Sequence, residues 1–107
     1  MAKRGLQLLV VEQKILNRIY AIRGQKVMLD EDLAETYGVE TKRLNEQVKR
    51  NIKRFPKDFM FTLTAKKYEN LKSQNATASW GGRRNLPNAF TEQGVTMLSS
   101  ILKAISL

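Results

Sequence analysis

The fold of this chain is decided by Val27–Leu63, VMLDEDLAETYGVETKRLNEQVKRNIKRFPKDFMFTL, which holds two short helix patterns with a tight turn between them. A strand pattern follows the second helix pattern. This order is typical of a helix-turn-helix with a sheet behind it. We therefore expect an α+β fold in which the helix pair packs on a small antiparallel sheet, with a basic wing-like loop and a C-terminal helix.

The first helix is predicted over Glu31–Tyr37. Asp30 stands just before Glu31 and Asp32, where its side chain can cap the helix and the acids face the positive end of the helix dipole. Gly38 follows as the residue best able to adopt the left-handed conformation that closes a helix. The apolar stripe of this helix consists of Leu33, Ala34 and Tyr37.

The second helix is predicted from a cap at Thr41 to about Asn51, after a turn of only three residues. Its buried edge is the i, i+4, i+8 series of Leu44, Val48 and Ile52. At about 100° per residue, a mostly cationic set of side chains points away from that edge. This set consists of Lys42, Arg43, Glu46, Lys49, Arg50 and Lys53, with Asn45 and Gln47 near the margins.

A basic, polar helix after a short acid-capped helix suits major-groove reading, because phosphates and base edges must be contacted together. In this reading Arg43 is the first candidate for a bidentate contact to guanine. The alternative is that these charges form an ordinary solvated helix face.

The overall charge favours a polyanionic partner. The chain has 107 residues, with 19 lysines and arginines against 10 acids, for a net charge of +9. The cations gather between Lys42 and Lys72, whereas acids dominate between Lys26 and Glu40. One face should therefore attract a polyanion such as nucleic acid or an acidic membrane surface.

The absence of two residue types from the sequence reduces the number of possible functions. The chain has no cysteine and no histidine, so it lacks thiolate ligands, the commonest metal ligand and the commonest general base. Neighbouring Glu31 and Asp32 diverge on a helix, and capping explains them without a metal. The longest apolar run, Leu8–Val11, is too short to span a bilayer. We expect a cytoplasmic binding protein without enzymatic activity, metal or cofactor.

The remaining chain is interpreted as an N-terminal arm or short helix over residues 1–17 and one DNA-binding domain over 18–107. A β-hairpin with its turn at Arg23–Gln25 leads into the first helix. A strand over Phe59–Leu63 precedes a helix capped by Thr64, and its alternation predicts that Phe59 and Phe61 pack beneath the helix pair. A short strand from Asn88 precedes a final helix, capped by Thr91, whose apolar stripe is Val95, Leu98, Ile101 and Leu102.

The polar segment 73–86 is expected to be a long loop or hairpin with Trp80-Gly81-Gly82-Arg83-Arg84 at its tip. Two glycines allow a tight turn, and Arg83 and Arg84 on a projecting tip can enter a minor groove or clamp phosphates. The alternative is a solvated turn with Trp80 folded into the core.

Several long motifs resemble one family of phage and bacterial domains. They are IYAIRGQKVMLDEDLAETYGVETKRLNEQVKRNIKRFPKDFMFTLT, LKSQ, WGGRR and AFTEQGVTMLSS, spread over about Ile19–Ser100. This family is named after the N-terminal domain of open reading frame six and is grouped with the KilA-N and Bro-N domains. The resemblance implies binding of double-stranded DNA, usually in a phage or prophage regulator.

Two roles stay open from the sequence. The first is a DNA-binding domain that uses the helix at about 41–52 in the major groove and the basic loop at 80–84 on an adjacent groove or backbone. The second is an antirepressor-like module that docks a repressor protein instead of DNA. The sequence leaves open whether the protein forms a homodimer.

Overall fold

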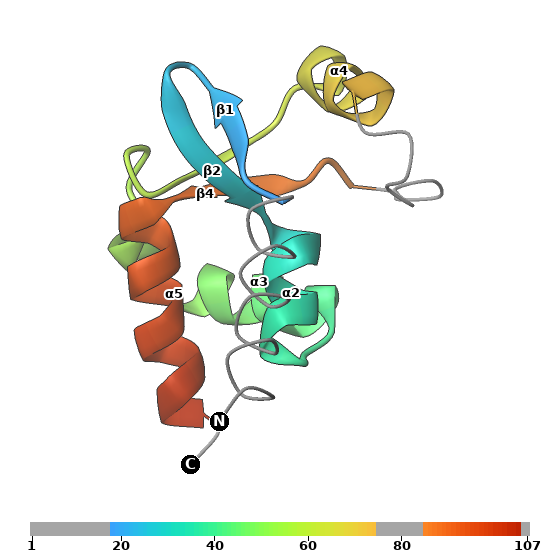
Figure 1. The fold of residues 1–107 in the computed structure, drawn as a ribbon. Coiled ribbons are helices and arrows are strands. Elements are labelled where there is room, and N and C mark those ends of the chain that lie inside the picture. The colour runs from blue at the N-terminus through green and yellow to red at the C-terminus, as the bar shows by residue number, and fades with distance from the viewer. Residues whose placement is uncertain (1–17, 75–84, 106–107) are drawn as a thin grey trace, which may run out of the picture.

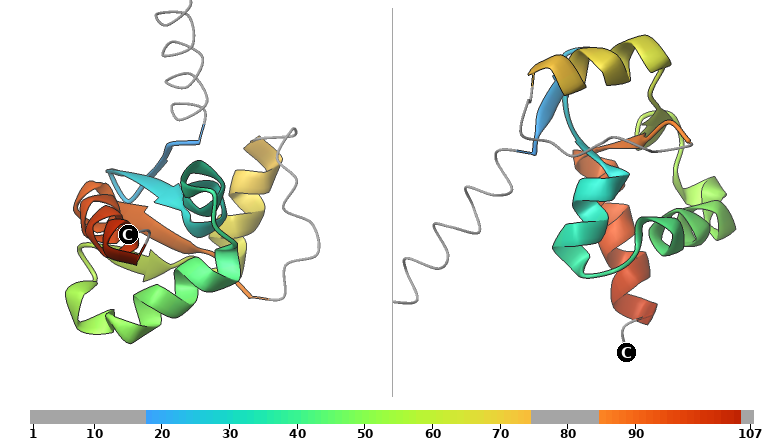
Figure 2. Two further views of the ribbon diagram at one scale, coloured as in Figure 1. Left: turned by 90° about the horizontal axis from the view of Figure 1, so that it is seen from below. Right: turned by 90° about the vertical axis from the view of Figure 1, so that its right-hand side faces the viewer.

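The computed structural model of the protein describes residues 18–74 and 85–105 and has an α+β arrangement. The elements are β1 (Tyr20–Ile22), β2 (Gln25–Leu29), α2 (Asp30–Tyr37), α3 (Thr41–Arg50), the 3₁₀ helix η1 (Ile52–Arg54), β3 (Met60–Thr62), α4 (Ala65–Gln74), β4 (Asn88–Thr91) and α5 (Glu92–Ile105). In Figures 1 and 2, α2, α3 and α5 lie together on one face of the sheet and α4 lies on the other. The predicted N-terminal arm and the wing tip at 80–84 fall outside the described residues.

The four strands form one antiparallel sheet in the order β1-β2-β4-β3. The predicted hairpin is confirmed, since Tyr20 pairs with Val27 across it. Its two-residue turn places Arg23 at φ 54° and Gly24 at φ 74°. Two positive φ values in succession are typical of the turns that match the twist of a tight hairpin.

Alternation along the strands divides the core into two layers. Met28 and its strand partner Phe90 face α2, α3 and α5, and Phe55 packs edge-on against the Phe90 ring. Leu29 and Ala89, the adjacent residues on the same two strands, face α4. Successive strand residues point to opposite faces, so this short sheet buries both of its sides.

The helix pair agrees with the sequence prediction at its turn but differs from it at the N-terminal caps. Gly38 takes the left-handed conformation, with φ 69° and ψ 33°, as predicted. The Val39 N–H donates to the Ala34 carbonyl at 2.9 Å, which closes α2. Asp30 and Thr41, predicted as caps, are instead the first residues of their helices, and neither helix has a side-chain cap.

Two residues predicted as buried lie at the surface. Leu44 and Val48 are buried on α3, but Ile52 is 52% exposed. The reason is that α3 ends at Arg50 and the chain tightens into η1, so the i+8 position no longer lies on the same edge. Tyr37, on the last turn of α2, is 37% exposed.

The aromatic residues of the β3 region split between the two layers. Phe59 packs against the core beneath α2, α3 and α5, as predicted. Phe61 was expected there too, but it packs with the α4 layer. The Arg23 guanidinium of the hairpin turn lies over its ring, 5.0 Å from the centroid.

The C-terminal half confirms both predicted capping threonines. The Lys67 N–H donates to Thr64 Oγ1 at 3.2 Å before α4, and the Gly94 N–H donates to Thr91 Oγ1 at 3.3 Å before α5. Gly94 lies directly against the Phe59 backbone, where a Cβ would overlap the carbonyl oxygen. This close approach seats α5 on the chain that enters β3.

Candidate nucleic-acid interface

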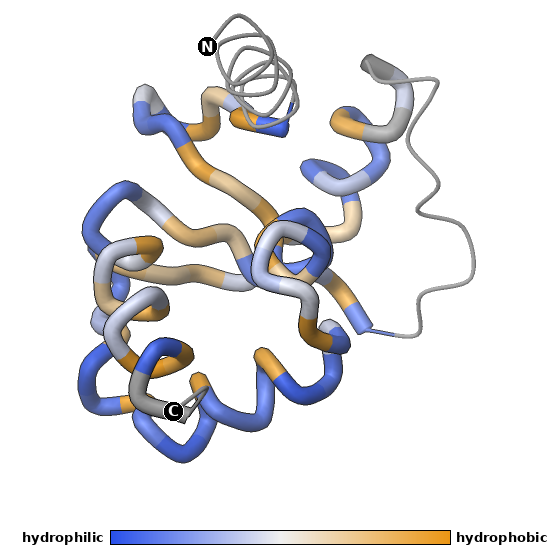
Figure 3. Tube along the Cα trace, turned by 60° about the horizontal axis from the view of Figure 1, so that its bottom comes forward, coloured by the Kyte–Doolittle hydropathy of each residue, from blue (hydrophilic) through white to orange (hydrophobic). Residues whose placement is uncertain are grey.

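Helix α3 has one buried edge and one charged face. Leu44 and Val48 fasten it to the core. The side chains exposed on α3 and η1 include all six of this predicted set: Lys42, Arg43, Glu46, Lys49, Arg50 and Lys53. Figure 3 shows mostly hydrophilic colours along α3. The structure thus presents the cationic set of the sequence prediction to solvent, on a helix that the core holds in place.

Arg54 belongs to the same charged surface and was not among the predicted contacts. It is exposed on η1 next to Lys53, and Lys57 is exposed in the turn that follows. The excess of cations after residue 42 was the sequence signal for these two side chains. We call the exposed cations of α3 and η1 the basic surface: Lys42, Arg43, Lys49, Arg50, Lys53 and Arg54.

Two predicted site residues on α3 are turned toward the protein. Asn45 and Gln47 are half-buried. Gln47 lines a cleft of about 170 Å³ between α3 and the end of α5, together with Arg43 and Leu102. Asn45 is held in hydrogen bonds within the protein. The other two predicted residues, Arg83 and Arg84, fall outside the described residues.

The hydrogen bonds of Asn45 belong to a network around the fully buried Asp30. Asn45 Nδ2 donates to Asp30 Oδ2 at 2.9 Å, and the Asn88 N–H donates to the same oxygen at 3.1 Å. Asn88 Nδ2 donates to Asn45 Oδ1 at 3.1 Å, and Thr62 Oγ1 donates to Asn88 Oδ1 at 2.8 Å. Four separated parts of the chain meet here: the start of α2, the middle of α3, the end of β3 and the start of β4.

The acidic helix α2 carries an ion pair instead of a metal-binding arrangement. Arg18 Nη1 lies 2.9 Å from Glu35 Oε2, and Arg18 Nε lies 3.9 Å from Asp32 Oδ1. The hydrogen bond that Arg18 donates to Glu35 raises the pKa of Arg18. Within residues 18–74 and 85–105, no cluster of three or more acidic side chains is arranged to hold a metal ion.

Burial raises the pKa of the Asp32 carboxyl from 3.8 to about 6, and the nearby carboxylates of Glu31, Glu35 and Asp30 add to the shift. The Arg18 charge opposes it. Asp32 Oδ2 is buried and has no hydrogen-bond partner in the part of the chain that the structure describes. A negative charge at this position therefore costs stability.

We expect Asp32→Asn to stabilise the protein at neutral pH. The folded protein binds the Asp32 proton more tightly than the unfolded chain, so wild-type stability should fall as the pH rises from about 4 to about 6. Removing the charge should raise the free energy of unfolding at pH 7.5 by up to about 3 kcal/mol, and the gain should vanish below about pH 4. Urea denaturation across this pH range measures both effects.

Glu35→Gln is the matched control, because it removes one negative charge from the same helix at an exposed position. It should bring no comparable gain. An equal gain from both variants would mean that general charge repulsion, not burial of Asp32, sets the pH dependence.

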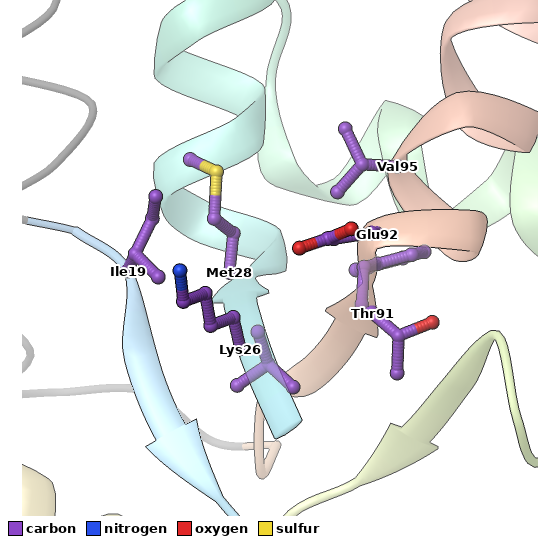
Figure 4. Close-up of a pocket in the computed structure, with 8 residues that line it drawn as sticks. Ile19, Lys26, Met28, Thr91, Glu92 and Val95 are labelled. Carbon is purple, nitrogen blue, oxygen red and sulfur yellow. The ribbon is translucent and has the colours of Figure 1, made fainter. Parts of the chain in front are cut away.

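A separate apolar groove lies between β2 and α5. It encloses about 210 Å³ and includes Ile19, Met28 and Val95 in its lining. Figure 4 shows Lys26 and Glu92 beside this apolar lining. None of its lining residues belongs to α3, so the groove is separate from the basic surface.

A family model described as ORF6N domain matches residues 17–101. The chain belongs to the ORF6N domain family. The match spans all four strands and most of α5, so the family assignment covers the helix pair, the sheet and the C-terminal helix together. It confirms the resemblance to the KilA-N and Bro-N-related domains. No curated protein and no solved structure matches the chain. None of the described helices of this ORF6N domain is long and apolar enough to cross a membrane.

Proposed function

We propose that this ORF6N domain binds double-stranded DNA as part of a phage- or prophage-type regulator, in the cytoplasm and without enzymatic activity. The observation that carries the proposal is the basic surface, whose six cations are exposed on α3 and η1 while the opposite edge of α3 is buried. The net charge of +9 adds a long-range attraction for a polyanion.

The dimensions of α3 suit insertion into the major groove. Its ten residues make a helix about 15 Å long. B-DNA has a major groove about 12 Å wide, which admits one α-helix. In this arrangement Arg43 contacts base edges, and the cations around it contact phosphates on both sides.

A salt titration with two matched charge reversals tests the proposal. Fluorescence anisotropy would measure binding to a labelled duplex of random sequence between 50 and 200 mM salt. If the five cations other than Arg43 contact phosphates, log affinity should fall against log salt with a slope of about −4.5. Lys49→Glu with Arg50→Glu should abolish most of this binding.

The control reverses two exposed lysines of α4, on the opposite face of the sheet, with Lys66→Glu and Lys67→Glu. Both double variants change the net charge by the same amount. The α4 variant should retain most of the affinity and the salt slope. Equal loss in both variants would show that only net charge matters and would overturn the placement of the interface on α3.

Arg43→Ala should weaken binding to a selected duplex by about 1–3 kcal/mol and relax the preference at one base position, if its contact to guanine is bidentate. Selection of bound sequences from a random pool, repeated with the variant, measures the change. A uniform loss across all sequences would identify Arg43 as a phosphate contact instead.

A second candidate is an antirepressor-like module that docks a repressor. It is favoured by the charge polarity of the helix pair, because Glu35 and Glu40 are exposed beside the exposed Tyr37. This surface precedes the basic surface in the chain and would suit a cationic protein partner. Absence of DNA binding at 50 mM salt, together with intact folding, would favour this second role.

The loop pair Arg83 and Arg84 and the homodimer remain predictions from the sequence. If the dimer binds DNA, a selected consensus should be palindromic, because a two-fold dimer reads two equivalent half-sites.

A further inference from the structure

We propose that the hydrogen bonds of the buried Asp30 with Asn45 and Asn88 position α3 for base recognition, so that these residues set DNA specificity without touching DNA. The proposal rests on the proposed function of α3 in DNA binding. It gives Asn45 a different role from the one its sequence position suggests, since its amide is committed to Asp30 and Asn88.

The chemistry of the network permits one arrangement of donors and acceptors. An ionised carboxylate only accepts hydrogen bonds, so Asp30 needs donors around it. One oxygen accepts from the Glu31 N–H at 2.7 Å, and the other accepts from Asn45 Nδ2 and the Asn88 N–H. The Asn45 amide must therefore turn its NH₂ to Asp30, which leaves its oxygen to accept from Asn88 Nδ2 at 3.1 Å.

These directional bonds restrain α3 in a way that its apolar contacts do not. The buried side chains of α3 are Leu44 and Val48, and apolar burial is non-directional, so it permits small rolls and slides of the helix. Asn45 is the neighbour of Leu44 on the helix surface. Its two bonds, one to the start of α2 and one to β4, fix the roll of α3 about its axis and its distance from the sheet.

Such a restraint matters more for base contacts than for phosphate contacts. Recognition groups must be held to within about 0.5 Å of their working geometry. Long cationic side chains reach phosphates from many helix positions and carry no sequence information. Loosening α3 should therefore reduce binding to the preferred sequence and leave binding to other sequences nearly unchanged.

The full burial of Asp30 supports a positioning role. A carboxylate could serve the N-terminus of α2 from an exposed position, and burying a charge is unfavourable unless it is well paired. Asp30 is nevertheless fully buried and bonded to two elements other than its own helix. Buried polar groups of this kind can define one arrangement among several that apolar packing alone would allow.

Two nearly isosteric variants with opposite charge changes test the proposal. Asp30→Asn removes one negative charge, whereas Asn45→Asp adds one. Each variant places a group opposite its partner that cannot make all of the wild-type hydrogen bonds. Asn51→Asp is the control, because it makes the same substitution at the end of α3, at a half-buried asparagine whose side chain donates to the Gln47 carbonyl of its own helix. The probes are a duplex selected by the wild type from a random pool and a shuffled duplex of equal length.

The measured quantity is the ratio of affinities for the selected and shuffled duplexes. We expect both network variants to lower this ratio at least tenfold, although their charge changes are opposite, while Asn51→Asp stays within about twofold of the wild type. Opposite shifts in the two network variants, or an equal loss in the control, would overturn the positioning role. Circular dichroism and thermal melting restrict the comparison to temperatures at which each variant is folded.

A second measurement follows the position of α3 without DNA. Because the chain has no cysteine, spin labels can be attached through Glu46→Cys on α3 and Lys66→Cys on α4, two exposed positions on opposite faces of the sheet. The distance distribution should broaden or shift in Asn45→Asp and remain narrow in Asn51→Asp. If neither spin-labelled variant differs from the wild type, the network does not position α3.

The two measurements separate the positioning role from the proposed function. A changed distance distribution in a protein that binds no duplex would overturn DNA binding and leave the restraint on α3 supported. Specific DNA binding that survives both network variants would support the proposed function and overturn the inference. If Asp30→Asn does not fold, Thr62→Val removes only the outermost bond, at an exposed position, and should lower the affinity ratio two- to threefold.

Discussion

Gly94→Ala is expected to destabilise the domain by about 3 kcal/mol or more, at the upper end of what overpacking costs. In an ordinary helix this change stabilises by about 1 kcal/mol, because alanine is the better helix former. Here the added Cβ would overlap the carbonyl oxygen of Phe59 and lie 2.8 Å from its carbonyl carbon. Both are backbone atoms, so no flexible side chain can move aside.

The neighbouring contacts make the clash harder to relieve. The same Phe59 carbonyl accepts the Thr91 N–H at 3.0 Å, and Thr91 Oγ1 donates to the Asp58 carbonyl at 2.6 Å. Moving α5 away would break these bonds. Urea denaturation measures the loss, and Thr96→Ala, at an exposed site on the same helix, should leave stability nearly unchanged. A Gly94→Ala variant as stable as the wild type would mean that α5 is seated differently.

Leu44→Ala is expected to cost about 2–5 kcal/mol of folding stability, the range for truncation of a fully buried leucine. Leu44 is 0% exposed and packs in the layer that joins α2, α3 and α5. Its loss would leave a cavity between the helix pair and α5, beside the cleft that Leu44 already lines.

Ile52→Ala is the control for Leu44→Ala, because the sequence pattern places both residues on one apolar edge and the structure does not. With 52% of Ile52 exposed, we expect a change within about 0.5 kcal/mol. Thermal melting and urea denaturation of the two variants decide the register. Equal effects would favour a continuous helix through residue 52.

The sequence predicted those parts of the fold that depend on local signals. The hairpin turn, the left-handed Gly38 and the caps at Thr64 and Thr91 each follow from one residue type at one position, and all are confirmed. Periodicity also placed Leu44, Val48 and Leu98 in the core correctly. Local chemistry sufficed here because each feature is completed within a few residues.

The errors arose where distant parts of the chain compete for the same residue. The neighbours of Asp30 in the sequence predict a helix cap. Its side chain instead bonds to Asn45 and Asn88, which lie 15 and 58 positions further along the chain. Phe61 was placed by alternation alone, which cannot say which face of a sheet lies under which helix. The exposure of the basic surface was predictable from helical period, whereas the inward turn of Asn45 required its partners in three dimensions.

The order of strands in the sheet has a consequence for folding during synthesis. β4 is the last of the described strands, yet it lies between β2 and β3 and is the sole neighbour of β3 within residues 18–74 and 85–105. A nascent chain that has reached only residue 74 can form the hairpin and short helices, but it has no strand to join β3 to them. Long-range pairings of this kind delay folding, because the chain loses the entropy of loop closure before the stabilising contacts have formed.

Asn88 is part of that last strand, so the bonds it makes to Asp30 and Asn45 can form only after β4 has left the ribosome. Until then α3 lacks the bond from Asn88 that links it to the sheet. The surface that would meet a partner is thus completed only after residue 91 has been synthesised, when β4 enters the middle of the sheet.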